Sequence, residues 1–259
     1  MTLVDLTIRF SLGGAIVGAI VGFLWAPFSS VLVDRPPLRD AAEMPGLPFR
    51  CPVCRNALLP RSIFPLLSAL VQRGRCLACG VSIPRFEVLN DVSCIGVGAL
   101  TGAFIGTRAW LPAMLFISLI LVPISLVDLR TRKIATKIVY PAAAGTAVLL
   151  ALAASNNGDW KRLLIAYGCG LGFSAFIWLL WLVYPKGMGP GDARLALMLG
   201  MGTGWFGIPG ALIGVMFGFV LGSAVGVPYS LIKLRNLKLQ LPFGPFLGLG
   251  AMLLIWFAP

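Results

Sequence analysis

Residues 115–133 read LFISLILVPISLVDLRTRK, and this stretch predicts both the fold class and the chemistry of the chain. Its apolar part starts near residue 110 and is about as long as the roughly 20 residues that cross a bilayer as a helix. It ends in Asp128, which is followed at once by a basic turn. A carboxylate at the end of a membrane helix costs free energy, so such residues usually have a function.

Apolar segments of similar length recur along the whole chain. Of the 259 residues, 58% are hydrophobic and 12% are charged, whereas about a quarter of residues are charged in soluble domains. We therefore predict an all-α polytopic membrane protein with about eight transmembrane helices and one polar cytoplasmic insert. The predicted spans cover residues 8–33, 88–107, 110–128, 138–155, 163–184, 193–205, 209–232 and 243–258. The predicted domains are a first helix (1–33), the insert (34–86) and a seven-helix domain (87–259).

The net charge of +12 is unevenly divided between the loops that join these spans. With eight spans, 17 of the 21 Lys and Arg residues lie on one side of the membrane and four lie on the other. Because cytoplasmic loops are rich in Lys and Arg, the first side is predicted to be cytoplasmic and both termini to lie outside. The same bias explains the positive charge, so we expect no nucleic-acid partner.

The chain has no histidine, which excludes Ser-His and Cys-His nucleophilic pairs and a His-based zinc protease. Acid–base chemistry therefore depends on nine carboxylates. Asp128 ends the third predicted span and Asp192 begins the sixth, so both are expected at the cytoplasmic face. Two close carboxylates in a site of low dielectric constant share a proton and can activate water for peptide hydrolysis. We predict Asp128 and Asp192 as the catalytic pair.

Other interpretations of these carboxylates remain open at this point. Asp128 could simply pair with Arg130 or Arg132 at a helix end. A proton-coupled transporter could use the same two carboxylates, and a helix interrupted by Gly and Pro is a transporter feature. A transporter of this kind is expected to have two halves that are related in sequence, and no such repeat is evident here. A peptidase that cuts deep within the bilayer would place the pair nearer the middle of its spans.

The segment before Asp192, residues 187–192, reads GMGPGD. Glycines allow a close approach of another backbone, and Pro190 restricts the bend. A substrate strand could therefore lie beside this segment at the membrane edge. We predict Gly189, Gly191 and Arg194 as substrate-binding residues.

Glu87 and Asp91 lie one helical turn apart at the start of the second span. They could bind a basic leader peptide near the active site. They could equally neutralise Arg73 and Arg85. We predict both carboxylates as candidate substrate-binding residues.

The insert contains two Cys-x-x-Cys pairs with 21 residues between them. Four thiolates at this spacing suit a tetrahedral zinc ion, and four ligands leave no open position for water. The reducing cytoplasm argues against disulfides. We predict a structural zinc site formed by Cys51, Cys54, Cys76 and Cys79.

Several motifs together resemble a known family. Residues 189–192, Gly-Pro-Gly-Asp, are similar to the Gly-x-Gly-Asp signature of intramembrane aspartic proteases. Residues 125–141 (SLVDLRTRKIATKIVYP) and 186–200 (KGMGPGDARLALMLG) resemble the two catalytic segments of bacterial prepilin peptidases, and residues 242–250 (PFGPFLGLG) resemble the signature of their last span. The chain departs from this pattern at Ala135 and Thr136, where the family has Pro and Asn, and at Arg194, where it usually has Lys.

The resemblance implies an activity and partners that composition does not. Prepilin peptidases cleave one peptide bond of a prepilin or pseudopilin at the cytoplasmic membrane face, just before the hydrophobic helix of the substrate. Water is the nucleophile. The family also implies a second reaction, in which S-adenosylmethionine methylates the new N-terminus. No Gly-rich fingerprint for that cofactor is visible in the sequence.

Overall fold

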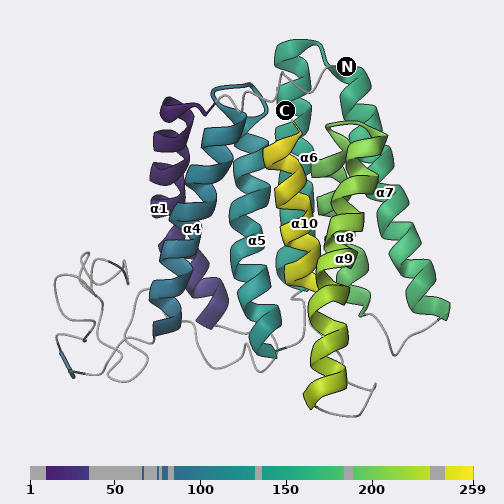
Figure 1. Cartoon of the computed structure of the whole chain (residues 1–259). Helices are drawn as coiled ribbons and strands as arrows, with labels where there is room; N and C mark the ends of the chain where they lie inside the picture. The colour runs from purple at the N-terminus through teal and green to yellow at the C-terminus, as the bar shows by residue number, and fades with distance from the viewer. Residues whose placement is uncertain are drawn as a thin grey trace.

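The computed structural model describes residues 10–34, 66, 75, 78–80, 85–131, 136–183, 189–233 and 243–258. Every long element in these ranges is an α-helix, as predicted (Figure 1). The helices are α1 (Leu12–Asp34), α4 (Arg85–Ile105), α5 (Leu111–Thr131), α6 (Thr136–Asn157), α7 (Trp160–Val183), α8 (Pro190–Gly204), α9 (Ile208–Lys233) and α10 (Gly244–Phe257).

Six of these helices are long and apolar enough to cross a membrane. The remaining two, α8 and α10, have 15 and 14 residues. At a rise of about 1.5 Å per residue they are roughly 21–23 Å long, shorter than a hydrocarbon core of about 30 Å. The sequence predicted a span at each of these positions. The structure has a helix at both, and each is shorter than the usual length of a single span.

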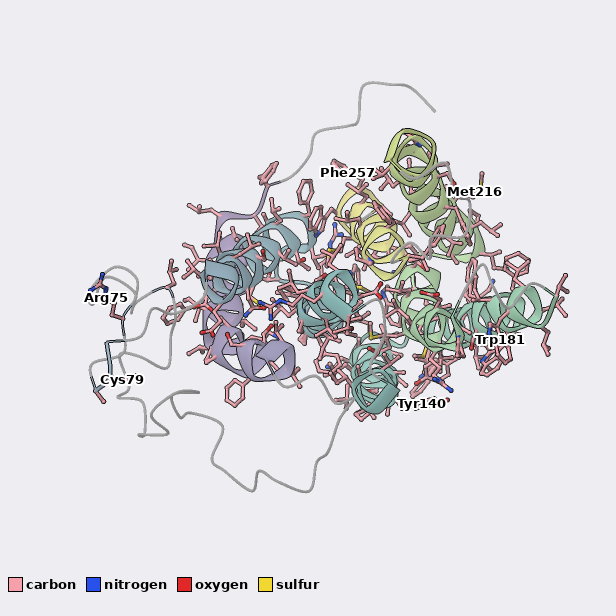
Figure 2. The ribbon with its side chains drawn as sticks, turned by 90° about the horizontal axis from the view of Figure 1, so that it is seen from below. Arg75, Cys79, Tyr140, Trp181, Met216 and Phe257 are labelled. Atoms are coloured by element: carbon pink, nitrogen blue, oxygen red, sulfur yellow. The ribbon has the colours of Figure 1, made fainter. Side chains whose placement is uncertain are left out.

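Helix α5 is the central helix of the bundle. In its apolar segment 83% of the residues are buried, against 22% to 44% in the other five candidate spans. Figure 2, which looks along the bundle, shows the other helices arranged around it. Helix α5 is apolar on all sides as far as Asp128, and such a helix can be buried on all sides.

Glycines bring several helix pairs into backbone contact. Between α1 and α4, Gly14 faces Gly102 and Gly18 faces Gly98, with spacings of four residues on both helices. Such small-residue stripes let membrane helices approach closely, which increases van der Waals contact where no hydrophobic effect drives association. The pairs α7–α8 and α9–α10 contain similar contacts, formed by Gly170 with Gly200 and by Gly218 with Gly250.

Consecutive helices run in opposite directions, so their ends meet at two opposite ends of the bundle (Figure 1). We call the end where α5 finishes and α8 and α10 begin the near end, and the opposite one the far end. The turns at the far end are short, and each of them contains a glycine with positive φ: Gly106, Gly158 and Gly207. The segments that carry most of the Lys and Arg residues connect helices at the near end.

Candidate active site

Asp128 lies in the last turn of α5 and is 3% exposed. Its Oδ2 accepts a hydrogen bond of 3.1 Å from the backbone N–H of Gly244, the first residue of α10. The N–H groups in the first turn of a helix have no partner within the helix, and this end of the helix is electrically positive. The N-terminus of α10 therefore holds the Asp128 carboxylate in place and favours its negative charge.

Asp192 is the third residue of α8 and is 8% exposed. Its Oδ2 accepts a hydrogen bond of 3.0 Å from the backbone N–H of Gly189, and its own N–H donates to the Gly189 carbonyl at 3.1 Å. This is the third-residue half of a capping box, in which the side chain reaches back over the helix start. Pro190 suits the first turn because its missing N–H would have no partner there.

These two carboxylates belong to one site at the near end. Helices α5, α8 and α10 contact one another, and the two carboxylates lie where α5 ends and α8 begins. Each carboxylate is held by one backbone N–H at a helix start, and no other described residue donates to either of them. Among the described residues, one oxygen of each carboxylate therefore has no donor, and a water or a substrate carbonyl would bind there. A proton-sharing pair of this kind can perform general acid–base hydrolysis.

Gly244 had no assigned role in the sequence interpretation. Residues 242–250 stood out only as a motif of the last span, and 116 residues separate Gly244 from Asp128. The signal that could have indicated a role is Pro245 directly after Gly244, which is typical of a helix start. A helix start at the membrane edge has unpaired N–H groups, and these need an acceptor.

Arg194 lies on a different side of α8 from Asp192. Two residues further along a helix correspond to a rotation of about 200°, so the two side chains leave the helix in nearly opposite directions. The Nε–H of Arg194 donates to the hydroxyl of Tyr140 in α6 at 3.2 Å. Its Cζ lies 5.7 Å from the ring centroid of Tyr140 and 5.9 Å from that of Trp178 in α7. Tyr140 is labelled in Figure 2 on the side of the bundle formed by α6.

Glu87 and Asp91 lie on α4, which contacts α5 and α10 of the aspartate site but forms its largest contact with α1. Glu87 is half-buried in the first turn, and Asp91 is 1% exposed. Oδ2 of Asp91 accepts a hydrogen bond from the backbone N–H of Leu66 at 2.9 Å. Next to it, Asn90 joins α4 to α1 by accepting from the Ser29 hydroxyl at 2.7 Å. In the described structure, therefore, Asp91 belongs to a polar cluster between α1 and α4.

The predicted zinc ligands fall mostly outside the described residues: Cys51, Cys54 and Cys76 do, and only Cys79 lies within them. Cys79 is exposed and lies outside the helical bundle (Figure 2). Within the described ranges, no group of three or more Cys, Asp or Glu side chains is arranged to hold a metal ion. The zinc site therefore stays a prediction.

Comparison with known proteins gives the family. The profile of the Type IV leader peptidase family matches residues 113–231, which include Asp128 and Asp192. The profile of the bacterial peptidase A24 N-terminal domain matches residues 20–105. The chain belongs to the type IV leader peptidase family. This membership confirms the predicted enzyme class, an aspartic endopeptidase, and does not favour a proton-coupled transporter.

Alignments with individual relatives cover most of the length of this peptidase. The chain is 28% identical to the prepilin leader peptidase/N-methyltransferase of Stutzerimonas stutzeri over 287 residues, covering 99% of this chain and 95% of that protein. It is 28% identical to the protein of the same name from Pseudomonas putida, covering 93% and 90%. The corresponding protein of Bacillus subtilis (strain 168) is also 28% identical, covering 78% and 79%. No solved structure is significantly similar to the chain.

Proposed function

We propose that this peptidase hydrolyses the leader peptide bond of a prepilin or pseudopilin, with Asp128 and Asp192 as its catalytic pair. The relatives are named for this reaction. The observation that supports the residue assignment is that α5 and α8 contact each other and that each carries a buried carboxylate at the near end, 64 positions apart in sequence. Each is held by a backbone N–H at the start of a helix.

The chemistry follows from one proton shared between the pair. The ionised carboxylate removes a proton from water, and the water oxygen attacks the carbonyl carbon of the scissile bond. The protonated carboxylate donates to the carbonyl oxygen, so no oxyanion has to form in a low-dielectric site. The tetrahedral intermediate then collapses, the C–N bond breaks and the leaving nitrogen receives a proton from the pair. No covalent enzyme intermediate forms.

We propose that Gly189 and Gly191 border the substrate strand, because both stand in the turn that positions Asp192. Neither adds a side chain that would occupy the space beside the carboxylate. Arg194 is better explained as a positioning residue. Its contacts with Tyr140 and Trp178 fix the rotation of α8, and this rotation decides whether Asp192 faces Asp128.

The setting of the reaction is also part of the proposal. The near end carries the basic connecting segments, so we place it at the cytoplasmic face of the bacterial cytoplasmic membrane, with both termini outside. The cut then falls at the cytoplasmic edge of the hydrophobic helix of the substrate. Glu87 and Asp91 lie toward this end of α4, where they are candidates to meet the basic leader.

Two bound groups belong to this proposal. The names of the relatives include N-methyltransferase, which implies S-adenosylmethionine as a methyl donor for the new N-terminus. Zinc, held by Cys51, Cys54, Cys76 and Cys79, would stabilise an insert that has little core of its own. Metal analysis of the purified protein tests the second point. We expect one zinc per chain, and loss of zinc in Cys51→Ser and Cys76→Ser variants.

The peptidase assignment is tested by incubating the detergent-purified protein with a prepilin-type substrate and following the mass of the products. Asp128→Asn and Asp192→Asn should each slow cleavage by about 100-fold or more while leaving the thermal unfolding transition in place. Asp159→Asn is the matched control, since it removes a carboxylate at the far end. A cleavage rate close to that of the wild type after either substitution in the pair would refute the residue assignment.

A further inference from the structure

A cluster of hydrogen-bond donors lies at the far end of the bundle, opposite the catalytic pair. Trp110 directly precedes α5 and Trp205 directly follows α8, and their ring centroids are 6.2 Å apart. The indole nitrogens of both side chains are buried, and neither has an acceptor among the described residues. Trp205 as a whole is 1% exposed. Buried N–H groups in native proteins are nearly always paired, so two adjacent unpaired ones indicate a missing acceptor.

Two arginines approach the same indole ring. The Cζ atoms of Arg108 and Arg162 lie 5.4 Å and 5.7 Å from the ring centroid of Trp110. Arg162 also pairs with Asp159 at 3.7 Å, but its side chain is 51% exposed, so this pair is weak. No described carboxylate pairs with Arg108. The cluster therefore combines two guanidinium groups and two indole N–H donors with a single carboxylate, and it has a net positive charge.

We propose that this cluster binds the phosphate group of an anionic phospholipid in the outer leaflet. Guanidinium groups match the geometry of phosphate oxygens, and the indole N–H groups supply further donors. The long, exposed side chains of Arg108 and Arg162 cover Trp110, so they can rotate to admit a ligand without repacking of the helices.

A lipid fits this position better than a free anion. The cluster lies where the candidate spans α5 and α7 begin, which is the depth of the headgroups, and tryptophan is enriched at that depth. A phospholipid is held at this depth by its acyl chains in the bilayer, whereas inorganic phosphate is not.

The position of the cluster gives the binding a structural consequence. Trp110 and Trp205 connect the far ends of α5 and α8, and the near ends of these two helices carry Asp128 and Asp192. A ligand that bridges the two tryptophans therefore stabilises the helix pair on which the catalytic carboxylates stand. The assignment to the outer leaflet rests on the proposed membrane orientation, whereas lipid binding at the cluster does not depend on the proposed peptidase reaction.

The test uses the full chain in detergent and measures its thermal unfolding as phosphatidylglycerol is added to the micelles. Phosphatidylethanolamine and inorganic phosphate are separate arms. A ligand that binds only the folded protein raises its unfolding temperature in proportion to its affinity. We expect phosphatidylglycerol to give the largest shift. The Arg108→Gln/Arg162→Gln variant should lower the apparent affinity by about tenfold or more, and Trp205→Phe by about two- to tenfold.

Two matched control variants distinguish a specific binding site from a general electrostatic attraction between the lipid and the protein. Lys161→Gln removes a positive charge next to Arg162, and Trp181→Phe removes an indole N–H near the other end of α7. Both should respond to phosphatidylglycerol like the wild type. The proposal is overturned if Lys161→Gln weakens the response as much as the double arginine variant. It is also overturned if inorganic phosphate or phosphatidylethanolamine matches phosphatidylglycerol, or if the double variant responds normally.

Discussion

The backbone N–H of Gly244 donates a hydrogen bond to Oδ2 of Asp128 at 3.1 Å, and this contact joins the start of α10 to the end of α5. Asp192 has the equivalent arrangement within its own helix, through the N–H of Gly189. Both members of the pair therefore lie at the positive end of a helix. This placement favours a negative charge on the pair in a membrane environment that opposes it.

Replacing Gly244 by proline tests this contact. Proline has no N–H, and it is tolerated at the first position of a helix. Loss of a hydrogen bond to a charged group costs about 1.5–3 kcal/mol, so we expect cleavage to slow by about 10- to 100-fold. Gly244→Ala keeps the N–H and should retain more activity. Equal losses in the two variants would assign the effect to packing around residue 244.

Asp128 and Asp192 should behave as one catalytic unit. A single Asn substitution removes proton transfer by the whole pair, and general acid–base catalysis contributes about 10²–10⁴-fold. The Asp128→Asn/Asp192→Asn double variant should therefore be only a few-fold slower than either single variant. Residual cleavage rates from long incubations give the comparison. Losses that multiply in the double variant would mean that the two carboxylates act independently.

The contact between α1 and α4 should tolerate no side chain at Gly18. A Cβ at this position would overlap the Gly98 backbone and lie only 2.7 Å from its carbonyl carbon. We expect Gly18→Ala to lower the free energy of unfolding by about 1–3 kcal/mol, since the two backbones must separate. Gly13→Ala is the control, because a Cβ there would have no heavy atom within 4 Å. Similar unfolding temperatures for the two variants in detergent would contradict this account.

Arg194 can be assigned to positioning or to substrate binding by separating kcat from KM. We expect Arg194→Ala to destabilise the protein by about 1–2 kcal/mol through the lost Tyr140 hydrogen bond and ring contacts. It should lower kcat with little change in KM, because Asp192 is then less well oriented. Tyr140→Phe, which removes only the hydroxyl, should have a smaller effect of the same kind. A rise in KM alone would indicate that Arg194 contacts the substrate.

Several features of this protein could be predicted from local sequence. The apolar runs indicate helices, and the structure has a helix at all eight predicted positions. The two aspartates could be proposed as a pair because carboxylates are scarce in such segments and both occur at the same predicted membrane face. The family could be recognised because its motifs are short and continuous in the chain. These are all properties of residues close together in sequence.

Other features depended on the tertiary structure. Neither the contact between Gly244 and Asp128 nor the contact of Arg194 with Tyr140 has a local signature, because each joins different helices. The sequence did not indicate the central position of α5 either. In a soluble protein the polar side of a helix indicates which face is exposed, but lipid and protein interior are both apolar. A membrane helix can therefore be identified from its composition, whereas its neighbours are decided by side-chain packing and by a few buried polar contacts.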